Sequence, residues 1–217
     1  MNRKIIPNIP DIGFYGNETD YGVNLFAAVF GIVGEKMERA ELAFYIGMAN
    51  HFAWIEGDWV GSRGCECFGN TGVTPFEEEL RFLKTMGWSA KHLSIPRGAD
   101  GKTQNIAREQ IRRDFAWSID KGYPILTRHA ESHRYAIAIG YEDGGEKIVC
   151  VEAVDGDLES GNHEACTETF VHADWLDTIQ DCIILQGRLE PVPERERVLE
   201  QLKHITARAC RADKISK

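Results

Sequence analysis

The chain has 217 residues, enough for a single domain that buries a sizeable core without disulfide bonds. Its hydrophobic share of 43% and charged share of 27% are ordinary for a soluble globular protein. The net charge of −9 argues against nucleic acid or an anionic membrane surface as a general partner.

The sequence contains no run of about 18 apolar residues, so no transmembrane helix is expected. The start of the chain has basic residues but no long apolar core, so no signal peptide is expected either. The cysteines are too widely spread for a disulfide framework, which favours reduced thiols and a cytoplasmic location. They are Cys65, Cys67, Cys150, Cys166, Cys182 and Cys210.

In chain order, the first half is predicted to be mainly helical. Residues 1–20 contain scattered Pro and Gly and indicate a loop. Residues 25–33 are apolar on nearly all sides, which is typical of a buried helix, and Gly34 ends it. A second helix is predicted over residues 37–48.

A glycine-rich stretch over residues 56–73 is too long for a simple connector, and such loops are often functional. The next helix has a clear start, because Thr74, Pro75 and Glu77 form a capping-box pattern. Gly87 ends this helix. A strand over 89–95, a polar loop over 96–104 and a helix over 105–120 are expected to follow.

The hydrophobic period then changes to two, which predicts strands. These cover residues 123–127, 134–141, 147–154 and 181–186, with a hairpin turn at Gly144-Gly145. In the second strand, the pattern places Tyr135, Ile137, Ile139 and Tyr141 on one face. An amphipathic helix is predicted from Pro193 onward. We therefore expect an α+β domain over residues 1–190, and a helix within 191–217 that belongs to it or makes a dimer contact.

The stretch that indicates chemistry runs from Lys121 to Asp155. His133 opens an alternating strand, and Glu152 lies on the partner strand of the hairpin. A histidine at the mouth of a strand faces a cleft, and a nearby carboxylate can orient its ring as in nucleophile–His–acid sites. The alternative is a surface histidine beside a solvated glutamate.

Three segments carry a family resemblance. They are "GYPILTRHAESHRYAIAIGYEDGGEKIVCVEAVDG", "IPNIPDIGFYGNETDYGVNLFAAVFGIVGEK" and "HADWLDTIQDCIILQG". The chain resembles the peptidase C39-like division of the papain-like superfamily, and within it the family of the butirosin biosynthesis protein H N-terminal domain. The resemblance implies a helical lobe packed on a twisted antiparallel sheet, with a cleft between them. Enzymes of this group cleave peptides or transfer acyl groups from thioesters.

The resemblance also implies functional residues. His133 matches the family's base, Glu152 lies near the acidic orienting position, and Asp155 is the second choice for it. The family places a cysteine at the start of the first buried helix, but this chain has Tyr21-Gly22-Val23-Asn24 there and no cysteine before Cys65. The family's oxyanion glutamine has no counterpart except Asn17.

Two alternatives concern Cys65 and Cys67 on the glycine-rich loop. Either thiol can act as a relocated nucleophile with His133 as base. The two thiols can also bind zinc with His51, His129 or His133, although one Cys-x-Cys pair is a weak zinc pattern. We expect no metal and no cofactor. Cys150, inside a strand, is expected to be buried filler.

The sequence thus predicts a degenerate papain-like protein that binds a small acyl, amide or peptide ligand near His133. The candidate ligand-binding residues are Asn17, Tyr21, Asn24, Trp59 and His129. A live cysteine hydrolase or acyltransferase is one alternative, and a non-catalytic interaction module is the other, in which the C-terminal helix forms a homodimer. No nucleic acid or membrane partner is expected.

Overall fold

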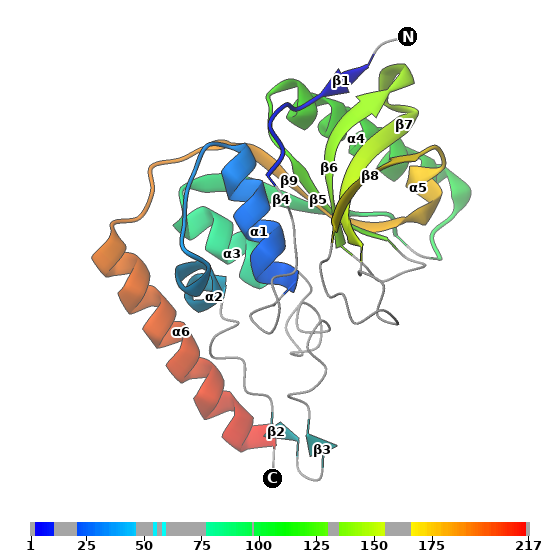
Figure 1. Ribbon diagram of the computed structural model, residues 1–217. Helices are drawn as coiled ribbons and strands as arrows, with labels where there is room; N and C mark the ends of the chain where they lie inside the picture. Colours follow the sequence, from blue (N-terminus) through cyan, green and yellow to red (C-terminus); the bar gives the residue numbers. More distant parts are fainter. Residues whose placement is uncertain are drawn as a thin grey trace, which may run out of the picture.

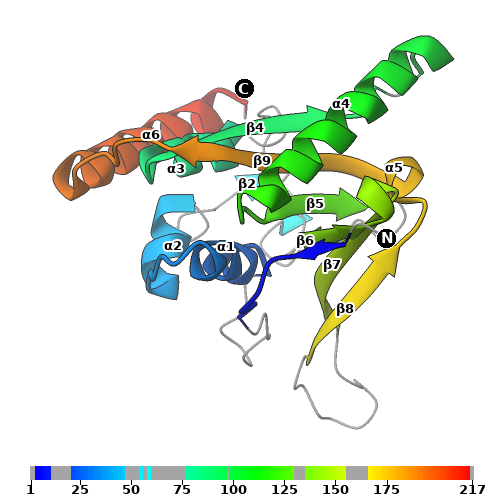
Figure 2. The ribbon, with the colours of Figure 1, turned by 90° about the horizontal axis from the view of Figure 1, so that it is seen from above.

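The computed structural model describes residues 3–10, 21–46, 54–55, 58–59, 77–96, 98–129, 135–154 and 166–215. Helices cover both faces of a seven-stranded sheet in which every pair of neighbours is antiparallel (Figures 1 and 2). The predicted α+β class is therefore confirmed.

The sheet has the strand order β4-β9-β5-β6-β7-β8, and β1 pairs with β6 beside the start of β5. Its strands are β1 (Lys4–Ile5), β4 (Trp88–Ser94), β5 (Ile125–His129), β6 (Tyr135–Glu142), β7 (Lys147–Val154), β8 (Cys166–His172) and β9 (Ile179–Arg188). A separate two-stranded ribbon joins β2 (Trp54–Ile55) to β3 (Asp58–Trp59). The β6–β7 hairpin is confirmed, with a 3-10 turn, Asp143–Gly145, between its strands.

The helices are α1 (Tyr21–Ile32), α2 (Arg39–Ile46), α3 (Glu77–Thr85), α4 (Gly101–Asp120), α5 (Trp175–Thr178) and α6 (Glu194–Ile215). The sequence pattern predicts the longer ones, but it places the start of α4 too late. Asp100 caps this helix by accepting a hydrogen bond from the Thr103 backbone N–H at 3.0 Å, so the polar segment from Gly101 is helical.

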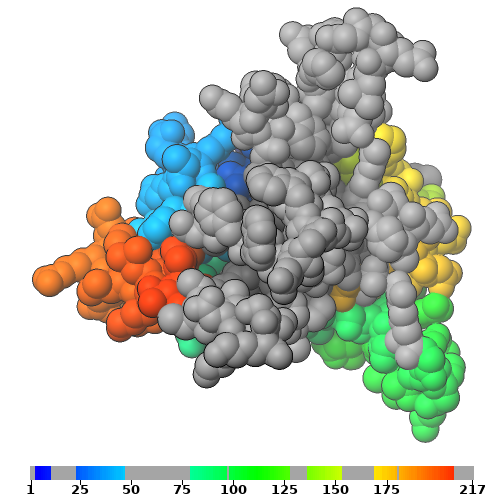
Figure 3. Space-filling view, turned by 90° about the horizontal axis from the view of Figure 1, so that it is seen from below, coloured from blue at the N-terminus to red at the C-terminus, as the bar shows by residue number. Residues whose placement is uncertain are grey.

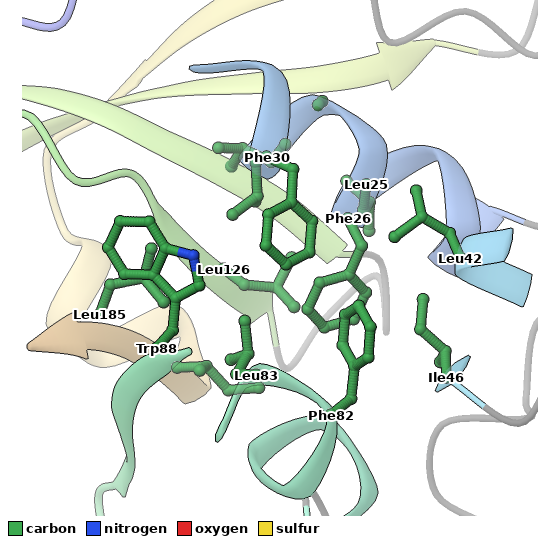
Figure 4. Packing of buried hydrophobic residues seen from close by; sticks show 14 of the residues in the cluster. Leu25, Phe26, Phe30, Leu42, Ile46, Phe82, Leu83, Trp88, Leu126 and Leu185 are labelled. Atoms are coloured by element: carbon green, nitrogen blue, oxygen red, sulfur yellow. The ribbon is translucent and has the colours of Figure 1, made fainter. Parts of the chain in front are cut away.

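One face of the sheet packs against α1, α2 and α3 through an apolar layer. The ring of Phe82 on α3 lies edge-on to Phe26 and Phe30 of α1, at centroid distances of 5.3 and 5.6 Å. Leu126 and Leu185 meet this layer from the sheet (Figure 4). Burial on all sides explains why α1 is apolar nearly all round.

The opposite face packs against α4 and α5. Phe115 of α4 contacts Trp175 of α5 at a centroid distance of 4.8 Å, and the Trp175 indole donates to the Gly145 carbonyl at 3.1 Å. We refer to the two sides of the sheet as the α1 face and the α4 face.

The α6 helix packs against α2 and α3. Its buried Gln201 donates to the Phe44 carbonyl at 2.7 Å and accepts from Arg81 at 2.8 Å. The guanidinium of Arg197 lies over the Tyr45 ring of α2, with its Cζ atom 5.3 Å from the ring centroid. These contacts attach the predicted C-terminal helix to the helices on the α1 face.

One predicted face assignment is wrong. Ile137 and Ile139 lie on the α1 face, but a register shift between Ala138 and Gly140 turns Tyr141 to the α4 face. The Tyr141 hydroxyl donates to Asp120 there, at 2.9 Å. The irregularity adjoins Gly140, where a Cβ atom would overlap the Lys4 carbonyl oxygen of β1.

The sequence pattern also fails for the short strands and for β8. Residues Lys4–Ile5 pair with β6, although residues 1–20 are predicted as a loop. The strand β8 is the edge strand beyond β7, and its sequence, CTETFVH, has no apolar face that would predict a strand. Among the described helices, none is long and apolar enough to cross a membrane.

Candidate functional site

The strands and α1 define one end of the sheet as the candidate site. β4, β5 and β7 finish there, and β6, β8 and β9 begin there, since all neighbours are antiparallel. The segment after α1 reaches the opposite end, where Glu35 accepts from the Trp88 indole at 2.5 Å and lies 3.0 Å from Arg188. The first turn of α1 therefore lies at the end we call the site end (Figure 1).

Seen from the site end, α2 and α6 lie to one side and β8 and α4 to the other (Figure 3). The helix dipole of α1 gives its first turn a partial positive charge. Such a helix start at the end of a sheet favours a ligand carbonyl oxygen or an anion, provided that further polar groups lie beside it.

Asn24, in the first turn and a half of α1, is the polar residue that distinguishes this helix. It is only 5% exposed, and within the described residues its Nδ2 atom is buried without a hydrogen-bond partner. An unsatisfied buried amide costs about 1–3 kcal/mol, so its retention inside an apolar helix calls for an explanation. A bound ligand that accepts from Nδ2 supplies one.

The structure describes part of the predicted site. The backbone of Tyr21 opens α1, His129 is the last residue of β5, and the backbone of Trp59 lies in β3 opposite Trp54. The other predicted residues lie outside the described ranges, and their roles stay predictions. They are Asn17, Cys65, Cys67, His133 and Asp155.

Glu152 lies on β7, next to Val151. Val151 belongs to the layer on the α1 face, whereas Cys150 belongs to the layer on the α4 face, so Glu152 also faces the α4 side. Its Oε1 lies 3.0 Å from Nε2 of His172 on β8. The described histidine partner of Glu152 is therefore His172, and the predicted role of Glu152 beside His133 stays a prediction.

A second histidine–carboxylate pair joins β4 to β9. His92 Nε2 lies 2.9 Å from Asp181 Oδ1, and the two side chains are 26% and 10% exposed. His92 is the cross-strand partner of Ile183, whose side chain is in the layer on the α1 face. The pair therefore lies on the α1 face, at the site end.

Sequence reasoning misses both pairs. His92 and Asp181 are far apart along the chain, and His172 lies on a strand that the sequence pattern does not predict, so only the structure reveals the pairs. For the His92–Asp181 pair, the sequence does offer one signal: Asp181 is an acidic residue directly before the apolar strand segment "CIIL". A carboxylate in that position needs a partner when it is buried.

The two described thiols are unsuited to nucleophilic attack. Cys150 and Cys182 are fully buried. Burial, and then the nearby Asp181 carboxylate, raises the pKa of the Cys182 thiol to about 12. Burial, and then Glu152, raises the pKa of Cys150 well above its ordinary range. The expectation that Cys150 is buried inside its strand is confirmed.

On the α4 face, a hollow of about 380 Å³ lies between α4 and α5. Its charges are paired with one another: Arg108 lies 2.5 Å from Asp177, and Arg112 lies 2.9 Å from Glu109 and 3.4 Å from Glu146. Within the described ranges, no group of three or more metal-ligating side chains comes together.

Comparison with known proteins gives no match, whether among protein-family models, curated proteins or solved structures.

Proposed function

We propose that the protein is a degenerate papain-like protein of the C39-like kind that binds a small acyl, amide or peptide ligand at the site end. The observation that carries this proposal is Asn24: a buried amide donor without a described partner, placed in the first turns of a buried helix. Nδ2 and the partial positive charge at that helix start are suited to a carbonyl oxygen of the ligand.

The helix start also explains why the usual thiol chemistry is not part of the proposal. Residues 21–24 contain no cysteine, serine or threonine. The described thiols are buried in the two apolar layers, and their raised pKa values keep them protonated. What remains of the nucleophile's position is a polar, electropositive helix start without a nucleophile, which fits binding.

A binding experiment tests the proposal. N-phenylbutyramide, a neutral amide with one carbonyl oxygen, is titrated into the protein and the heat of binding is measured, alongside a thioester and a blocked dipeptide of similar size. We expect the wild type to bind at least one of these compounds and Asn24→Leu to bind it at least tenfold more weakly. Equal binding by the two proteins would remove Asn24 from the site.

A matched control is Ser118→Ala, which removes another buried polar group. The Ser118 hydroxyl donates to the Tyr123 carbonyl at 3.1 Å and the Leu185 carbonyl at 3.4 Å, so its hydrogen-bonding capacity is already used within the protein. Ligand binding by this variant should equal that of the wild type, because no donor is lost at the site end.

A second candidate function, homodimerisation through α6, is favoured by one observation. Leu199 and Leu202 are 47% and 48% exposed, although Val198 and Gln201 on the same helix pack onto the domain. Adjacent exposed leucines on one helix face are typical of a helix–helix contact. Sedimentation equilibrium tests this: a dimer that Leu202→Glu dissociates supports the contact, and a monomeric wild type refutes it.

A further inference from the structure

The outward side of α4 carries a row of exposed residues that the functions proposed above do not use. It lies on the side of the helix opposite the buried Ile111 and Phe115. At 3.6 residues per turn, its members fall within about 80° of one another around the helix axis. We call this row the α4 stripe, and it consists of Lys102, Ile106, Glu109, Arg113, Trp117 and Asp120.

The first half of α4 makes few contacts within the domain. None of residues 101–110 is buried, and the buried residues of this helix all lie in its second half. The first half extends beyond the edge of the sheet and stands out from the molecular surface (Figures 2 and 3). Helices in proteins gain most of their stability from packing, so an exposed half-helix favours contact with another molecule.

Two large apolar side chains lie on the α4 stripe. Ile106 is 62% exposed and Trp117 is 42% exposed. A shallow hollow of about 540 Å³ lies along the stripe, lined by Ile106, its charged neighbours Lys102, Glu109 and Arg113, and Asn105. Exposed apolar side chains that adjoin a hollow and are rimmed by charges are typical of a protein–protein contact surface.

The charges of the α4 stripe leave capacity for a partner. Among the described residues, no carboxylate pairs with Lys102 or Arg113. Glu109 binds Arg112 of its own helix through Oε1, at 2.9 Å, which leaves Oε2 for a second guanidinium. The stripe can therefore both receive carboxylates and offer one.

The order of residue types along the α4 stripe indicates what the partner is. From its first residue to its last, the stripe reads basic, apolar, acidic, basic, apolar, acidic. Read backwards, each basic position becomes acidic and each apolar position stays apolar. A second α4 helix that lies antiparallel to the first therefore meets it with opposite charges, whereas a parallel one would place like charges together.

The spacing supports the same pairing. Lys102 and Asp120 are equally far along the helix from Ile111, so antiparallel helices centred there place Lys102 opposite Asp120 of the partner subunit. Glu109 likewise faces Arg113 of the partner subunit.

Ile106 and Trp117 match to within one residue, a rise of about 1.5 Å, which side chains of this size accommodate. The apolar pair thus lies between the two charge pairs, as in antiparallel helix contacts with an apolar seam and flanking ion pairs.

We propose that the α4 stripe is a contact between two copies of this chain, in which the α4 helices pack antiparallel about a two-fold axis at the level of Ile111. Each copy gives and receives the same contacts, so the dimer is closed. This surface is separate from Leu199 and Leu202 of α6, because α6 packs on the helices of the α1 face and α4 covers the opposite face.

Charge exchange at Glu109 and Arg113 tests the contact and its register. Arg113→Glu places acidic residues opposite each other twice, and Glu109→Arg does the same with basic residues. Each variant alone should dimerise at least tenfold more weakly than the wild type in sedimentation equilibrium. In an equimolar mixture of the two variants, both positions again face opposite charges, so the mixed dimer should form with a dissociation constant within about threefold of the wild-type value.

Leu202→Glu is the control, because it changes the other exposed helix and should leave this dimer intact. Both exchanged residues are exposed, so the variants should fold, and circular dichroism checks this. A monomeric wild type, a dimer that Leu202→Glu dissociates and Arg113→Glu does not, or a mixture that dimerises no better than either variant alone would overturn the inference. None of these results bears on ligand binding at the site end.

Discussion

Replacing Asn24 by leucine should make the protein more stable while it weakens ligand binding. The side chain is 5% exposed and its Nδ2 has no hydrogen-bond partner among the described residues. Removing a buried unsatisfied amide recovers about 1–3 kcal/mol, and leucine has a similar shape. Allowing for imperfect packing, we expect a gain of about 1–2 kcal/mol in the free energy of unfolding.

For a chain of this size, 1 kcal/mol corresponds to about 2–4 °C in Tm. Urea denaturation and a thermal scan of Asn24→Leu should therefore both show stabilisation without ligand. Ser118→Ala, whose hydroxyl is hydrogen-bonded, should instead lose about 1 kcal/mol. A loss of 1 kcal/mol or more in Asn24→Leu would refute the reasoning, because it would mean that the amide is satisfied in the folded protein.

Three further predictions concern groups away from Asn24. In native protein at pH 8, Cys150 and Cys182 should resist iodoacetamide and react only after unfolding; with a pKa of about 12, Cys182 is thiolate in on the order of one molecule in ten thousand. Burial and the hydrogen bond to Asp120 raise the pKa of Tyr141, so the protonated hydroxyl stabilises the folded protein fully below about pH 10, and this stabilisation is lost as the pH rises further. In urea denaturation, the free energy of unfolding of Tyr141→Phe should therefore fall less above pH 10 than that of the wild type. Glu35→Ala should cost about 1–2 kcal/mol in urea denaturation, because the Trp88 indole loses its acceptor.

The labelling experiment also separates the proposed function from its thiol-dependent alternative. A relocated nucleophile at Cys65 or Cys67 requires one cysteine outside the buried pair to react far faster than the rest. Mass spectrometry after brief labelling identifies it. Uniformly slow labelling of every cysteine would rule out a live thiol enzyme.

The elements that the sequence predicts best are those whose pattern reflects burial. The apolar run around Phe26 predicts a buried helix, and the alternation over residues 134–141 predicts β6. Boundaries are less predictable, because local bonds decide them: the Asp100 cap extends α4 backwards, and the register shift at Gly140 reverses the direction of Tyr141.

The candidate site is less predictable than the fold. Asn24 is identifiable because it interrupts an apolar helix. The pairing of His92 with Asp181 is not, because it depends on β9 inserting between β4 and β5, a non-local pairing that no local pattern encodes. The Glu152–His172 pair is missed for another reason, because β8 has no clear apolar face that would predict it as a strand.

The most direct test of a ligand site at the site end is an NMR titration of isotopically labelled protein with N-phenylbutyramide. We predict that the backbone amide shifts concentrate in residues 21–25 of α1, 91–94 of β4 and 181–183 of β9. Shifts confined to the hollow between α4 and α5, or no shifts at saturating ligand, would contradict the account.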